Sequence, residues 1–347
     1  MTLERRDLRT FWPEEDDLVP IFSAERNGGR TRPRPPRLTA ADFTPERMLR
    51  PKARPAADGW RRAVYVATGG TVSVGPSPAE LRRRELAAQV KAPITGCRTV
   101  AFVSRKGGVG KTTTCLLVGH TFALHRGDRV VALDANPDAG TLGYRLRRET
   151  DETIATLLHD RAALHRYADV RAYSSQAESR LEVIAGADSL DANTLERSTV
   201  REAVELVERH YNLVCLDTAA GVLSPAAQGV LDAADQIVLI SPTGLDGARA
   251  ASSTLDWLEA HGHDDLAHAA VTALNGVRAQ QGDIDVDRIE EHFASRCRAC
   301  VRIPWDSHIE TGAEVVLEAL RPSTRDALLE LAAALARGFA EPSRRRS

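Results

Sequence analysis

Residues 104–113, Ser-Arg-Lys-Gly-Gly-Val-Gly-Lys-Thr-Thr, decide the fold of this 347-residue chain. The stretch holds two of the four lysines, Lys106 and Lys111, whereas arginine supplies nearly all of the other positive charge. A compact ammonium on a flexible stem reaches a phosphate that a planar guanidinium would crowd. Two lysines kept in one glycine-rich loop therefore predict a nucleotide site in which each lysine has its own role.

The segments on both sides of this loop complete a phosphate-binding motif. Residues 99–103 read as a strand, and residues 112–127 read as a helix that ends near Gly127. In this order, backbone amides cradle phosphates, Lys111 bridges the outer phosphates, and the following threonine hydroxyl reaches Mg²⁺. Arg105 stands where the strict P-loop has glycine, but the variant x-K-G-G-x-G-K-T is matched throughout. The alternative is a glycine-rich turn without a ligand. The expected cofactor-binding residues are Gly107, Gly108, Val109, Gly110, Lys111, Thr112 and Thr113.

The rest of the chain after Arg98 alternates apolar runs with helical stretches. This alternation predicts an α/β fold with a mainly parallel sheet and helices on both faces. We expect a last helix, from about Ser323 to Phe339, to cover the sheet. The expected strands are 99–103, 129–133, 181–186, 212–216, 236–240, 269–274 and 299–303.

Composition sets the expected domains. Residues 1–58 are rich in arginine and proline and predict a disordered arm, 59–96 a partly helical lead-in with a short hairpin near Gly69, and 97–347 a P-loop domain. The net charge of −2 gives no general attraction to nucleic acid. Five cysteines without an export signal argue against a disulfide framework. With no long apolar run, we expect a cytoplasmic protein without a transmembrane segment.

The loop pattern resembles the deviant Walker A motif of the MinD/ParA-type P-loop ATPases, and the resemblance extends from about Cys97 to the end of the chain. It implies ATP and Mg²⁺ as cofactors and a homodimer that forms on ATP binding. In that family the lysine that matches Lys106 reaches the partner's phosphates across a nucleotide sandwich. The alternative is that Lys106 only screens charge within its own subunit.

The second expected strand runs into residues 133–140, where the family shows an Asp-x-Asp switch I. Asp134 matches the first acid and is suited to hold a Mg²⁺-bound water. Asn136 replaces the second acid, and an amide can orient a water but cannot accept its proton. Hydrolysis is therefore expected to be slow, or Asp138 takes over. With the two loop lysines, Asn136 and Asp138 complete the candidate catalytic set.

Three later segments resemble further parts of the family's site. Asp217 ends a strand, as the acid that supports Mg²⁺ does, and Gly221 can bring an amide to the γ-phosphate. Asn275 matches an adenine-reading position, and Pro304 and Asp306 match the loop over the base. The alternatives are ordinary helix-cap and turn chemistry. The candidate metal residues are Thr112, Asp134 and Asp217.

A narrower resemblance concerns the EspI-type ATPases associated with actinobacterial type VII (ESX) secretion, which also carry a Pro-rich amino-terminal extension. It implies an ATP-dependent switch that regulates or positions a secretion machine, with components of that machine as partners and with peripheral membrane association through a partner. The matching stretches are 133–142, 164–184, 234–262, 293–314 and 324–336.

Three competing interpretations remain open. A partition-type ATPase would bind DNA without sequence preference, and the small cluster Arg145, Arg147 and Arg148 is the candidate surface. An ATP-sensing module would bind nucleotide with little turnover. Cys297 and Cys300 match the spacing of an iron-sulfur carrier of the same superfamily, but burial as small apolar residues is favoured.

Overall fold

The structure is a computed structural model that describes residues 59–69, 75–137, 140–186, 195–278, 283–310, 312, 314–341 and 343. The expected arm, residues 1–58, lies outside the described residues, and so does Asp138. The expected disorder of the arm and the boundary at residue 97 therefore stay predictions.

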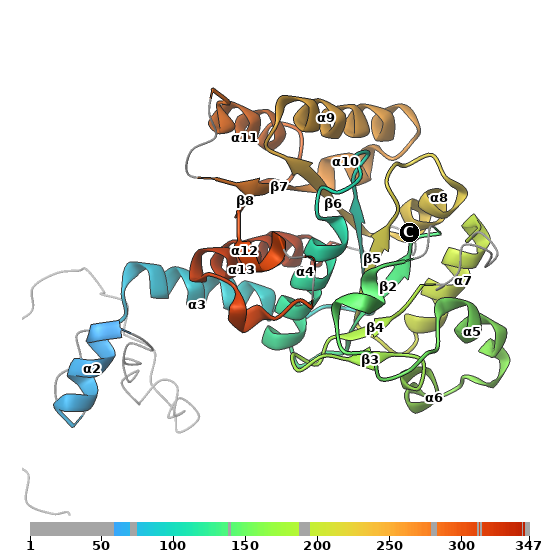
Figure 1. Ribbon diagram of the computed structural model, residues 1–347, viewed down its shortest axis with the longest axis horizontal. Coiled ribbons are helices and arrows are strands. Elements are labelled where there is room, and N and C mark those ends of the chain that lie inside the picture. The colour runs from blue at the N-terminus through green and yellow to red at the C-terminus, as the bar shows by residue number, and fades with distance from the viewer. Residues whose placement is uncertain are drawn as a thin grey trace, which may run out of the picture. The chain divides into compact units, whose positions relative to one another are not determined.

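An eight-stranded sheet in the order β3-β4-β2-β5-β1-β6-β7-β8 forms the centre of the fold (Figure 1). Every neighbouring pair is parallel except β3 and β4. All seven expected strands are present, so the predicted α/β class is confirmed; β3, with two residues, was too short to show a pattern. The strands are β1 Arg98–Val103, β2 Val130–Ala135, β3 Ser175–Gln176, β4 Glu182–Ile184, β5 Leu213–Thr218, β6 Gln236–Pro242, β7 Val271–Val277 and β8 Ala299–Pro304.

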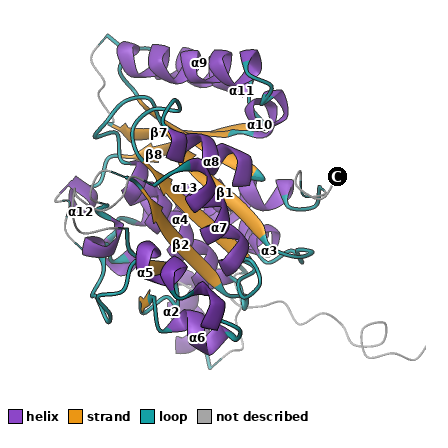
Figure 2. Cartoon of the chain, turned by 90° about the vertical axis from the view of Figure 1, so that its right-hand side faces the viewer, coloured by secondary structure: helices purple, strands orange, loops and turns teal. Residues whose placement is uncertain are grey.

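Helices cover both faces of the sheet (Figure 2). Helices α3, α4 and α13 pack on one face, and α5 and α7–α11 pack on the other. The helices are α2 Gly59–Ala67, α3 Pro78–Val90, α4 Lys111–His125, α5 Ile154–His159, α6 Tyr167–Arg171, α7 Arg197–Val207, α8 Pro225–Ala233, α9 Leu245–Ala260, α10 Asp264–Ala269, α11 Val286–Ala294, α12 Ser307–Glu310 and α13 Pro322–Gly338, with 3₁₀ turns η2 Leu142–Arg145, η3 Arg161–Ala163 and η4 Leu317–Ala319.

The central strand β1 shows why the sheet needs both layers. Its side chains alternate between the faces: Val100 and Phe102 join the core under α4 and α13, while Ala101 and Val103 join the opposite core. A strand that is apolar on both faces is stable only when both are covered. The last helix, α13, fills its expected place because the side chains of Leu328, Leu331, Leu335 and Phe339 are all buried.

The lead-in segment differs from the expectation in one respect. The expected hairpin near Gly69 is wrong, because residues 59–67 form helix α2. Apolar residues recur there at helical intervals, at positions 60, 63, 64 and 67, and this period outweighs the glycine pair as a local signal.

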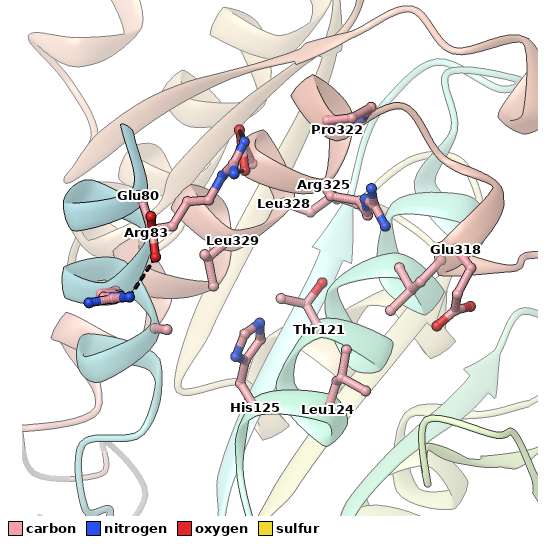
Figure 3. Close-up of a pocket in the computed structure, with 14 residues that line it drawn as sticks. Glu80, Arg83, Thr121, Leu124, His125, Glu318, Pro322, Arg325, Leu328 and Leu329 are labelled. Carbon is pink, nitrogen blue, oxygen red and sulfur yellow. Dashed lines mark hydrogen bonds and ion pairs between the residues drawn. The ribbon is translucent and has the colours of Figure 1, made fainter. Parts of the chain in front are cut away.

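Helix α3 packs against α13, and a bidentate pair between Arg83 and Asp326 joins them. A cavity of about 460 Å³ lies between α3, α4 and α13, with Leu124 and Leu329 among its apolar lining and Arg325 on its polar side (Figure 3). It lies at the carboxyl end of α4, whereas the phosphate loop precedes the amino end. This cavity is therefore separate from the expected nucleotide site.

Parallel pairing brings the expected metal residues to one edge of the sheet. Asp134 in β2 and Asp217 in β5 are directly paired in register. The loop from Ser104 to Gly110 follows β1, which also pairs with β5. The phosphate loop and both carboxylates therefore meet at the carboxyl ends of three neighbouring strands, where open α/β sheets bind their ligands.

Candidate functional site

The phosphate loop adopts backbone conformations that its glycines allow. Gly108 and Gly110 have φ angles of 71° and 92°, in the left-handed region. Gly110 is the N-cap residue of α4 and makes no side-chain capping bond to the first turn. The amides of that turn are thus left for an external acceptor, and together with the helix dipole they favour an anion such as a phosphate.

Lys111 lies at the start of α4 and is buried. Burial lowers the pKa of Lys111, and the nearby Asp217 carboxylate works in the opposite direction. A buried ammonium needs anionic partners to offset the lost hydration. The phosphate groups of a nucleotide would supply them beside the loop amides.

Lys106 differs from Lys111 because its side chain is exposed. Its backbone N–H donates to Ser104 Oγ at 3.2 Å, which fixes the turn that presents the residue. One lysine thus faces inward and the other faces solvent, as two separate roles require. The reach of Lys106 into a partner subunit stays a prediction.

The candidate metal side of the site consists of Asp134, Asp217 and Thr112. Thr112 Oγ1 donates to Asp217 Oδ2 at 2.6 Å, while Asp217 Oδ1 is buried and has no hydrogen-bond partner among the described residues. Burial, followed by the charge of Asp134, raises the pKa of Asp217 to about 7. A buried oxygen without a donor is costly, and a cation next to it removes that cost.

Mg²⁺ fits this donor set. Carboxylate and hydroxyl oxygens are the ligands it prefers, and Mg²⁺ usually takes one or two carboxylates and completes its shell with water and substrate phosphates. Within the described ranges, no group of three or more His, Cys, Asp or Glu residues could hold a metal by itself. Two carboxylates and one hydroxyl beside a phosphate loop therefore suit a nucleotide-bound Mg²⁺ better than a closed protein cage.

Backbone groups hold Asp134 in place. Its carboxylate accepts hydrogen bonds from the N–H groups of Leu142, at 3.0 Å, and Asn136, at 3.2 Å. Burial raises the pKa of Asp134 to about 6, and these bonds oppose the shift. Gly140 and Gly186 pack so closely on the carboxylate that a Cβ at Gly140 would collide with it. Asn136 thus supports the first acid through its backbone, and the effect of its side chain on hydrolysis stays a prediction.

The amide of Gly221 makes a hydrogen bond to the phosphate loop. Its N–H donates to the Ser104 carbonyl at 2.9 Å, and its φ is 98°. The amide expected at the γ-phosphate is therefore engaged with the phosphate loop in this structure. A contact between Gly221 and a γ-phosphate would require this bond to break.

Asn275 and Asp306 also make bonds within the protein. Asn275 Nδ2 donates to the Val109 carbonyl at 2.8 Å and so supports the phosphate loop directly. Asp306 Oδ2 accepts from Arg321 N at 2.9 Å and from Thr324 Oγ1 at 2.8 Å, and its Oδ1 accepts from a backbone N–H of α12.

Asp306 is almost fully buried and is held by those three donors. Burial would raise its pKa, but the hydrogen bonds hold the pKa below its ordinary value. Asp306 thus links β8 to α13, and Pro304 ends β8 two residues earlier. The base-contacting roles of Asn275, Pro304 and Asp306 stay predictions, and the structure gives two of them an additional structural task.

Sequence reasoning assigned Arg145 only to a surface cluster and missed its place at the site. Its Nη1 donates to Thr113 Oγ1, in the first turn of α4, at 3.0 Å. Gly140 and Gly186 were missed as well. No short motif marks these residues, since each is placed by the path of the chain after β2 or β4.

The two cysteines of the C-x-x-C stretch are packed as expected. The Cys297 side chain is buried and accepts a hydrogen bond from Thr272, while Cys300 is half-buried. Burial raises the pKa of Cys297, and it raises the pKa of Cys300 to about 12. A raised pKa opposes the thiolate form that a metal requires.

The described part of the chain contains no helix with the length and apolar character of a membrane span.

Comparisons with known proteins agree with this geometry. A family model described as an AAA domain matches residues 97–267. The ESX-1 secretion-associated protein EspI of Mycobacterium tuberculosis (strain H37Rv) is 36% identical over 290 residues, which cover 83% of this chain. The match spans only 43% of EspI. The septum site-determining protein MinD of Bacillus subtilis is 22% identical over 198 residues, or 56% of this chain and 72% of MinD.

Solved structures share the fold. A ParA family ATPase from Chlorobium tepidum matches with a TM-score of 0.57 and 20% identity over 68% of this chain and 98% of its own. The cell division ATPase MinD of Pyrococcus furiosus matches with a TM-score of 0.53 and 20% identity over 69% and 98%. The chain thus shares the x-K-G-G-x-G-K-T loop and the parallel-sheet fold of the MinD/ParA-type P-loop ATPases and is similar in sequence to EspI, which together support a MinD/ParA-type ATPase.

Proposed function

We propose that this protein is an ATP-dependent dimerisation switch. The observation that carries the proposal is the meeting of an uncapped P-loop helix, the buried Lys111 and the Asp134–Asp217 pair at one edge of the sheet. ATP would bring two copies together, with the exposed Lys106 reaching the partner's phosphates. Hydrolysis would then release the two copies.

Each residue of the site has a definable task in this cycle. Lys111 and the first-turn amides of α4 would bind the phosphates, and Thr112 with Asp217 and Asp134 would hold Mg²⁺. When bound, Mg²⁺ would neutralise phosphate charge and polarise the phosphoryl oxygens. Gly221 would exchange its bond to the Ser104 carbonyl for a γ-phosphate contact, so that switch II changes position with the nucleotide.

Turnover is expected to be slow. Asn136 cannot take a proton from an attacking water, so the chain's own contribution at this position is limited to orientation. A protein with this property remains closed for longer after binding ATP. In the extreme case it is an ATP sensor with little hydrolysis, and the asparagine favours this second candidate.

Our proposal for the cellular role rests on sequence similarity alone. EspI is described as secretion-associated, and the match covers less than half of it. We propose that this protein regulates or positions a type VII secretion machine, with components of that machine as partners. It would reach the membrane only through such a partner.

One experiment tests the switch: the size of the purified protein is measured with ADP and with ATP while phosphate release is followed. The variants are Lys106→Ala and Asn136→Asp. We expect ATP to produce a dimer in the native chain, Lys106→Ala to prevent it, and Asn136→Asp to raise turnover. A native chain that stays monomeric with ATP and is unaffected by Lys106→Ala would contradict the sandwich dimer.

A further inference from the structure

Arg145 is a cation at the nucleotide site that the proposed cycle does not use. It is the last residue of η2, the 3₁₀ turn that follows switch I. Its Nη1 donates to Thr113 Oγ1 at 3.0 Å, and its Nε is buried without a hydrogen-bond partner among the described groups. The charge of Arg145 already acts on the Asp217 carboxylate, whose pKa it lowers, but the buried Nε without a partner is costly and favours a second anion beside the phosphate loop.

The main chain around Arg145 is fixed on two sides. At the start of η2, Leu142 N–H donates to the Asp134 carboxylate. At its end, the Arg145 carbonyl accepts from Val315 N–H at 3.0 Å. The main chain of Arg145 is therefore placed by the metal-side carboxylate and by the segment before α13, and the bond to Thr113 directs its guanidinium to the first turn of α4.

The position of Thr113 defines which part of a nucleotide the guanidinium faces. In a P-loop, the lysine serves the outer phosphates and the next hydroxyl serves the metal, while the loop and first-turn amides hold the inner phosphates. Lys111 and Thr112 fill the first two roles here. Thr113 belongs to the same first turn of α4, whose amides would face the inner phosphates, so a group bonded to its hydroxyl would lie near them.

We propose that Arg145 binds the α/β-phosphate region of the nucleotide, beside Thr113. This inference rests on the proposed function, because it requires a nucleotide in the P-loop. Both ADP and ATP carry these phosphates, so Arg145 raises the affinity for both to the same degree and does not read the γ-phosphate. Arg145 is thus a binding residue, distinct from the dimer lysine Lys106.

The test compares Arg145→Gln, Arg145→Lys and the matched control Arg147→Gln, which removes an exposed arginine two residues away. Dissociation constants for ADP and ATP, with Mg²⁺, are measured by calorimetry on the full chain. Unfolding temperature is measured without nucleotide. We expect Arg145→Gln to lower the affinities for ADP and ATP equally, by about tenfold, and Arg145→Lys to restore most of both affinities. Arg147→Gln should leave both affinities unchanged.

Other outcomes overturn the inference in recognisable ways. Unchanged affinity in Arg145→Gln, with a native chain that binds ATP, would refute the role of Arg145 and leave the proposed function intact. A loss confined to ATP would refute the assignment to the inner phosphates. A lower unfolding temperature in both Arg145 variants, without rescue of affinity by lysine, would show a structural role only. A native chain that binds neither nucleotide would instead refute the proposed function.

Discussion

Two buried aspartates at the same edge of the sheet, Asp217 at its centre and Asp306 beyond its outer strand, have opposite surroundings. Both are at most 3% exposed. Within the described part of the chain, one oxygen of Asp217 has no donor, and the pKa of Asp217 is raised, whereas Asp306 receives three donors, and its pKa is lowered. Equal burial of the same residue type therefore yields a candidate ligand position in one region and a structural link in the other. What separates them is whether the protein itself satisfies the carboxylate.

The largest expected effect tests the central region through Lys111. Lys111→Ala should lower the affinity for ATP and for ADP by about a hundredfold or more, because the buried ammonium is the main cation at the phosphate loop. Calorimetry on the purified variant measures this loss. Lys91→Ala, which removes an exposed lysine at the end of α3, is the matched control and should bind as the native chain does. Native affinity in Lys111→Ala would show that the loop is not the nucleotide site.

The outer region is tested through Asp306. Asp306→Ala should lower the free energy of unfolding by about 3 kcal/mol, since it leaves the Arg321 amide and the Thr324 hydroxyl without their acceptor. Denaturant titration gives this value. Asp287→Ala, at an exposed aspartate paired with Arg302, should cost less than about 1 kcal/mol. If Asp306 contacts the base only, the variant would lose nucleotide affinity and keep its stability.

Asp217 should respond in the opposite direction. In EDTA and without nucleotide, Asp217→Asn should raise the free energy of unfolding at pH 8 by about 2 kcal/mol, because the burial cost of this carboxylate outweighs its attraction to Lys111 and Arg145. A carboxyl whose pKa is raised in the folded state stabilises the fold below its unfolded pKa, and that stability is lost as pH rises through about 7. The increase in the free energy of unfolding that Asp217→Asn causes should therefore be smaller at pH 5.5. A variant less stable than the native chain at pH 8 would remove the contrast with Asp306.

The smallest effect concerns Asn275, which belongs to the outer strands but contacts the central loop. Asn275→Ala should lower the affinities for ADP and GDP by a similar factor, about fivefold, because it removes a hydrogen bond of about 1 kcal/mol to the Val109 carbonyl. Competition against a fluorescent nucleotide measures both. A loss for ADP alone would instead make Asn275 a reader of the base.

Most of the fold could be predicted from the sequence. All seven expected strands are present, because short apolar runs that alternate with helical stretches are typical of a parallel sheet covered on both faces. The expected hairpin near Gly69 was wrong because a local glycine pair is a weaker signal than a helical apolar period. The two-residue strand β3 had no pattern to detect.

Only the central part of the candidate site could be predicted from the sequence. Lys111 and Thr112 lie within one motif, and Asp134 and Asp217 end strands that parallel pairing places side by side. The site role of Arg145 was not predictable, because Arg145 and Thr113 are 32 residues apart and meet only through the packing of η2 on α4.

The sequence by itself determined a P-loop between a strand and a helix, a mainly parallel sheet, and two acids at neighbouring strand ends. These features depend on short spacings and on a side-chain period, which act before any long-range contact forms. Only the tertiary structure decided that Gly221 bonds the phosphate loop, that Asn275 supports it, and that Asp306 is satisfied by α12 and α13 while Asp217 is not. Hydrogen-bond satisfaction depends on which donors approach within about 3 Å, and packing of distant segments sets that distance.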